Sequence, residues 1–141
     1  KSGEKRMRSI SINAGRFFLG LYFLLPAIAK LVVPETHLVL MAARGIIFAD
    51  ALLLFAGVSS LLGALALISG RYVKMAAYGL VIYTTLVTVL IHPVWVIESE
   101  AQNFIKNVGI IGGLLILAGY APFRWLSVRD WWKSDAAVKR S

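Results

Sequence analysis

The sequence contains no cysteine and few charged residues, since Asp, Glu, Lys and Arg make up 16% of its 141 residues. Without cysteine the chain can form no disulfide and offers no thiolate ligand to zinc or to an iron–sulfur cluster. Soluble domains are usually about 25% charged and about 45–50% apolar. Here 59% of the residues are hydrophobic and the mean hydropathy is +0.77. The composition therefore excludes a disulfide scaffold and a disordered chain, and it indicates a membrane protein.

Sequence motifs for cofactor binding and catalysis are also missing. There is no phosphate-binding glycine loop after a strand, no P-loop and no nucleophile elbow. His37 and His92 could in principle ligate a haem or a metal ion, but no metal-ligand spacing accompanies them. We therefore expect no metal site and no cofactor held by this chain alone.

Four long apolar runs dominate the sequence, at about residues 12–33, 46–68, 73–91 and 104–121. Each approaches or exceeds the roughly 20 residues that an α-helix needs to cross about 30 Å of hydrocarbon. Proline or glycine follows each run, at Pro34, Gly70, Pro93 and Pro122. The sequence thus predicts an all-α fold: a single domain over residues 1–141, built as an integral membrane bundle of four transmembrane helices.

Basic residues are distributed unevenly between the two sides of this bundle. Only Lys30, Arg44 and Lys106 belong to one side, and the other twelve flank the opposite ends of the spans: Lys1, Lys5, Arg6, Arg8, Arg16, Arg71, Lys74, Arg124, Arg129, Lys133, Lys139 and Arg140. Because lysine and arginine remain on the cytoplasmic side, both termini are predicted to be cytoplasmic. This asymmetry also accounts for the net charge of +8, so we expect no nucleic-acid partner.

Aromatic residues lie where membrane interfaces are expected. Trp95 follows the third span on the outer side, and the inner side carries Tyr72, Trp125, Trp131 and Trp132. In the tail, residues 122–141, helical spacing would place Trp125, Val128 and Trp132 on one face. We expect this segment to form a short interfacial helix over about residues 122–133.

Polar residues from separate spans are predicted to reach a similar depth near the outer surface. They are Lys30, Asp50, His92, Lys106 and Asn107. One interpretation is that Lys30, Lys106 and Arg44 extend to outer headgroups, with Asp50 as an ion-pair partner. The other is a polar pocket for an anionic or carbonyl-bearing ligand such as a quinone head group, because charges inside a membrane are costly unless they are used.

Several segments resemble the DoxX family of small four-span membrane proteins. The resemblance covers about Gly15 to Gly119. It rests on the following segments: GRFFLG at 15–20 leading to Lys30-Leu31, Gly63-Ala64-Leu65 with Arg71 and Ala76-Ala77, His92-Pro93-Val94-Trp95, and Phe104–Asn107 with Gly112–Leu115. The resemblance implies a four-span fold. Some members are implicated as membrane subunits of thiosulfate:quinone oxidoreduction, and others accompany redox partners.

Two positions depart from the family pattern. Many members have a glutamate where this chain has Ser59, and a glycine where it has Pro26. A proton-handling role of that glutamate would have to move elsewhere in this chain, for example to Asp50.

Two functions from different classes remain open. The first is a redox-complex subunit in a bacterial or archaeal cytoplasmic membrane, shaping a quinone-accessible site. Lys30 and Lys106 would then supply electrostatic contact and His92 proton exchange, while Asn107 donates a hydrogen bond and Trp95 stacks.

The second is a non-catalytic scaffold that packs small-residue stripes against other transmembrane subunits. Such stripes occur at Gly109 and Gly113, and at Ala56, Ser60 and Ala64. A channel or transporter is less favoured, because the mid-membrane polar residues are few.

Overall fold

The computed structural model describes residues 1–140, and every regular element in that range is helical. The long helices are α1 (Ser2–Val32), α3 (Ala49–Ser69), α4 (Val73–Ile91) and α5 (Ala101–Tyr120). The short ones are α2 (Glu35–Ala43), the 3₁₀ helix η1 (Glu98–Glu100) and α6 (Asp135–Arg140). Within the described range, four helices are long and apolar enough to cross a membrane. The predicted four-span, all-α fold is therefore confirmed.

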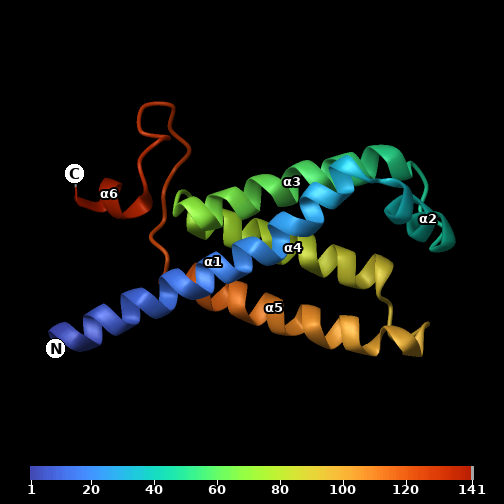
Figure 1. Cartoon of the computed structure of the whole chain (residues 1–141), viewed down its shortest axis with the longest axis horizontal. Coiled ribbons are helices and arrows are strands. Elements are labelled where there is room, and N and C mark those ends of the chain that lie inside the picture. The colour runs from blue at the N-terminus through green and yellow to red at the C-terminus, as the bar shows by residue number, and fades with distance from the viewer. Residues whose placement is uncertain (141) are drawn as a thin grey trace.

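Figure 1 shows α1, α3, α4 and α5 running alongside one another. The first turns of α1 and the short helix α6 lie at one end, while α2 lies at the other. We call the end with the first turns of α1 and with α6 the basic end, and the end with α2 the loop end. An even number of spans returns the chain to the side on which it starts, as the predicted topology requires.

The observed helix ends differ from the predicted span ends where polar residues extend a helix. The helix α1 begins at Ser2 rather than near residue 12, and its first ten residues are exposed. By contrast, α4 has the predicted limits of 73 and 91. Helix α2 lies within the connection between the first two spans.

Small residues allow the helices to approach closely. Helix α1 packs mainly on α3, and α4 mainly on α5. At Gly20, an added Cβ would lie 2.5 Å from Ile68 Cγ1, and at Gly63 it would lie 2.9 Å from Leu80 side-chain atoms. The core between the helices is apolar and includes Phe23, Ala64, Leu67, Val73, Ala77, Leu80, Leu114, Leu117 and Ala118. Because most large apolar side chains on the outer faces are exposed, the bundle presents a surface suited to lipid.

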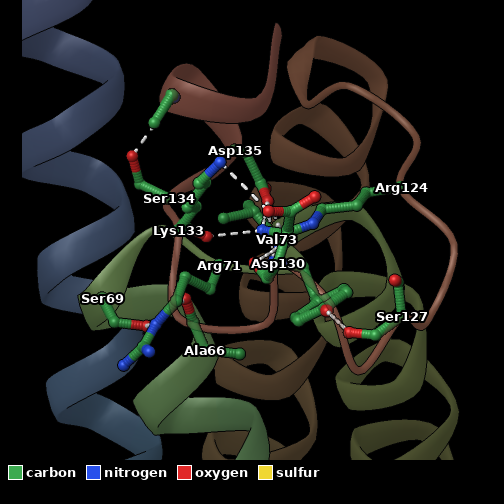
Figure 2. A network of polar contacts seen from close by, with 12 residues as sticks. Ala66, Ser69, Arg71, Val73, Arg124, Ser127, Asp130, Lys133, Ser134 and Asp135 are labelled. Carbon is green, nitrogen blue, oxygen red and sulfur yellow. Dashed lines mark hydrogen bonds and ion pairs between the residues drawn. The ribbon is translucent and has the colours of Figure 1, made fainter. Parts of the chain in front are cut away.

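The C-terminal tail contains the predicted short helix, but at other residues. Helix α6 begins at Asp135, and residues 122–134, where we expected the helix, form an irregular loop. Arg124 explains the difference. Its guanidinium donates to the main-chain carbonyl oxygens of Lys133, at 2.6 Å, and of Asp130. Figure 2 shows these residues gathered at the start of α4.

Candidate functional site

A pocket at the loop end brings together two of the predicted site residues, Lys30 and Asp50. Lys30 lies in the last turn of α1 and Asp50 in the first turn of α3. The cavity has a volume of about 180 Å³, and its remaining walls are apolar: Leu31, Pro34, Leu38, Leu53 and Leu54. The site is thus a largely apolar pocket with one cationic and one anionic residue.

Lys30 has no carboxylate partner within ion-pair distance among residues 1–140, although Asp50 lines the same pocket. Its Nζ lies 5.8 Å from the centre of the Tyr83 ring, as in a cation–π contact. Such a contact compensates a buried charge less completely than a carboxylate does. Lys30 therefore remains able to pair with an electron-rich ligand.

His37, on α2, lies close enough to Lys30 to experience its charge. Its pKa is lowered first by burial and second by the positive charge of Lys30, while the nearby Val33 backbone acts in the opposite direction. The His37 Nδ1 atom is buried without a hydrogen-bond partner in the described part of the chain. Sequence reasoning treated His37 only as a metal ligand and did not connect it with Lys30.

Asn107 and Lys106 belong to a second polar group, centred on Tyr22 of α1. The Tyr22 hydroxyl donates to Asn107 Oδ1 at 3.2 Å, and Asn107 Nδ2 donates to Thr88 Oγ1 at 2.9 Å. Lys106 Nζ lies 5.9 Å from the centre of the Tyr22 ring. Asn107 is therefore committed to joining α1, α4 and α5, while Lys106 remains exposed.

An aromatic row connects the two lysines. The rings of Tyr22 and Phe23 meet edge to face at 5.1 Å between centres, and those of Phe23 and Tyr83 at 6.2 Å. Lys106 lies at the Tyr22 end of this row and Lys30 at the Tyr83 end. The two lysines thus interact with rings of one aromatic cluster.

His92 belongs to a third polar group, which holds the loops together. Its Nδ1 lies 2.6 Å from Glu100 Oε2, while Arg44 Nη2 donates to Glu100 Oε1 at 2.9 Å. Arg44 Nε also donates to the Ile91 carbonyl at 2.9 Å, which fastens α2 to the end of α4. Arg44 pairs with Glu100, and no ion pair within residues 1–140 includes Asp50, so the structure does not support the interpretation in which Asp50 is an ion-pair partner of these cations. Sequence reasoning gave Glu100 no role.

Trp95 is exposed and meets Phe104 edge to face, at 6.2 Å between ring centres. It does not line the Lys30–Asp50 pocket. Over residues 1–140, no three His, Asp or Glu side chains converge as metal ligands. His37 and His92 therefore have no third ligand from these residue types in that range.

The chain was also compared with known proteins. A protein-family model described as DoxX matches residues 11–93, which is more than half of the chain. The match includes Lys30, Asp50 and His92 but ends before Lys106 and Asn107. Comparisons with curated proteins and with solved structures gave no match. Because this model matches more than half of a four-span bundle, through the end of its third span, the chain belongs to the DoxX family.

Proposed function

We propose that this chain is a membrane subunit of a redox complex in a bacterial or archaeal cytoplasmic membrane, and that the Lys30–Asp50 pocket receives a quinone head group. The observation that carries the proposal is Lys30, which has no carboxylate partner within ion-pair distance among residues 1–140, in a pocket at the loop end whose walls apart from Asp50 are apolar. Family membership supports the redox setting.

A quinone head group has the chemistry that this pocket would complement. Its ring is flat and apolar, which suits walls of leucine and proline. Its carbonyl oxygens accept hydrogen bonds, and they become more basic as the ring is reduced. The Lys30 ammonium can donate to such an oxygen, and Asp50 can exchange a proton with water at the rim, since it is exposed. Electrons would come from a cofactor-bearing partner subunit.

The other predicted site residues do not line the pocket. Asn107 connects α1, α4 and α5, and His92 is bound to Glu100 in the connection between α4 and α5. Lys106 and Trp95 lie outside the pocket lining.

The proposal is tested by measuring quinone binding to the purified chain in lipid nanodiscs, with a short-chain ubiquinone and a short-chain menaquinone as probes. Loss of a hydrogen bond from a charged donor costs about 1.5–3 kcal/mol, which is about a tenfold or greater rise in Kd. We expect this for Lys30→Met. The matched control is Lys106→Met, which removes a lysine at the same end of the bundle and should leave Kd unchanged. Equal affinities of wild type and Lys30→Met, with intact folding, would refute the site.

A scaffold function is favoured by a different observation, on α5. An added Cβ at Gly109 or Gly112 would meet nothing within 4 Å, and Ile105 and Ile116 nearby are exposed. Another transmembrane helix could approach closely there. Gentle detergent extraction followed by mass measurement distinguishes the two functions. A fixed-ratio complex, without quinone binding by the purified chain, would support the scaffold.

A further inference from the structure

The loop at residues 122–134 exposes large apolar side chains. We call it the aromatic loop. It has no helix of its own. Its outward side chains include Trp125, which is 78% exposed, and Val128, which is 90% exposed, together with Phe123, Leu126, Trp131 and Trp132. An apolar patch of this kind marks a surface that meets a membrane or another protein.

The two ends of the aromatic loop are fastened to the turn between α3 and α4. Arg124 Nη1 lies 3.3 Å from Asp135 Oδ1, and both residues are buried. The Asp135 carboxylate accepts the backbone N–H groups of Tyr72 at 2.8 Å and Val73 at 3.0 Å. The backbone N–H of Asp135 donates to the Gly70 carbonyl at 2.9 Å. Figure 2 shows Arg124 and Asp135 converging beside Val73.

This arrangement satisfies polar groups inside the loop and leaves its apolar groups outside. The Arg124 guanidinium donates hydrogen bonds to two loop carbonyls, and it lies 4.2 Å from the centre of the Tyr72 ring. The Asp135 carboxylate lies at the N-terminus of α4, where the unpaired N–H groups and the helix dipole favour a negative charge. The loop is therefore built to hold tryptophan side chains outward from a fixed base.

The position of the loop indicates what those side chains meet. In Figure 1 the chain after α5 turns away from the direction of the long helices, and the loop projects past their side at the basic end. Its base is the α3–α4 turn, which joins the ends of two helices that are long and apolar enough to cross a membrane. A loop that projects sideways at this level lies over the lipid beside the bundle, where tryptophan is favoured.

Charge also favours a lipid surface. Arg129 is exposed and forms no ion pair in the described part of the chain. The Arg71 guanidinium lies 5.8 Å from the centre of the Trp131 ring. Exposed cations interleaved with tryptophan complement anionic headgroups above an apolar layer.

We infer that the aromatic loop is a preformed membrane anchor. It inserts Trp125, Leu126 and Val128 into the leaflet at the basic end, with Arg129 at the level of the lipid phosphates. The Arg124–Asp135 pair holds it in the inserting conformation. This anchor is independent of the quinone pocket at the opposite end of the bundle.

The experiment uses tryptophan fluorescence of the full chain in vesicles of phosphatidylcholine and phosphatidylglycerol. Trp95→Phe leaves tryptophan only in the loop, since the chain has four tryptophans. We expect lipids brominated near the headgroup end of the acyl chain to quench the emission strongly, lipids brominated near its tip to quench less, and aqueous iodide to quench little. Strong iodide quenching would place the loop in water. Absence of quenching by either agent would mean that protein covers the loop. Both results would overturn the inference.

A second measurement avoids dependence on Trp95→Phe. Because the chain has no cysteine, a spin label at Ser127→Cys reports on the loop alone. Collisions with dissolved oxygen should exceed those with a water-soluble nickel complex, and Asp135→Ala should reverse this order by releasing the loop. A matched label at Ser2→Cys, in the exposed first turn of α1, should favour the nickel complex in both backgrounds. A nickel-accessible label at Ser127→Cys, with Asp135 intact, would contradict the anchor.

Discussion

Asn107 shows how a single buried polar residue can connect three helices. Its amide accepts from Tyr22 of α1 and donates to Thr88 of α4, whose hydroxyl donates to the Thr84 carbonyl at 2.6 Å. No water is available inside hydrocarbon to replace these bonds. Helix rise alone predicted how far along its span Asn107 lies, but the rotation of each helix about its axis decides which side chains Asn107 meets.

The first prediction concerns the bond between Asn107 and Thr88. Asn107→Leu and Thr88→Val should each destabilise the bundle, and the double variant should be less destabilised than the sum. Coupling energies of such bonds in membranes average about 0.6 kcal/mol and reach about 1.7 kcal/mol. Reversible unfolding in mixed micelles measures the free energy of unfolding of the wild type, the two single variants and the double variant, which together give the coupling energy. Strict additivity would mean that the hydrogen bond contributes nothing.

The second prediction concerns His37. Because the charge of Lys30 lowers the pKa of His37, Lys30→Met should raise that pKa. Burial still acts on the ring, so the pKa should remain below its ordinary value. Lys106→Met, as the control, should leave it unchanged. An NMR titration of the imidazole resonances measures both. An unaltered His37 pKa in Lys30→Met would show that the two side chains do not interact.

Among the helices, hydropathy predicted the spans well and the polar ends poorly. The limits of α4 agree because both ends coincide with an abrupt change in polarity. The start of α1 was missed because its first residues are helical but polar. The 122–134 segment was mispredicted because helical spacing of Trp125, Val128 and Trp132 carries no information on Arg124, whose bonds to loop carbonyls replace helical ones.

The third prediction compares two glycines in different helices. Gly20→Ala places a Cβ 2.5 Å from Ile68 Cγ1 and 3.3 Å from the Ala64 carbonyl oxygen. This Cβ would push α1 away from α3, which should lower the free energy of unfolding by about 1–3 kcal/mol. Gly109→Ala meets nothing within 4 Å, so the isolated chain should keep or slightly raise its stability, since alanine favours helix by up to about 1 kcal/mol. Equal losses in both variants would contradict the α1–α3 packing.

On the scale of the whole molecule, the chain has two differently built ends. The loop end carries the Lys30–Asp50 pocket, and the basic end carries the aromatic loop. The sequence predicted which polar residues lie toward the loop end of the bundle, because helix rise sets how far along a span each residue lies. It could not predict that they form separate groups. Lys30 and Asp50 line one pocket, while His92 pairs with Glu100 and Asn107 with Tyr22.

The central claim is that four spans place the basic end in the cytoplasm and the Lys30–Asp50 pocket in the outer half of the membrane. The absence of cysteine allows a direct test by labelling single-cysteine variants in intact cells with a membrane-impermeant maleimide. Ser99→Cys, in the exposed η1 turn, should react from outside, and Ser2→Cys should react only after the membrane is permeabilised. The opposite pattern would invert the topology, and labelling of both variants from outside would contradict the three spans, α1, α3 and α4, that separate the two positions.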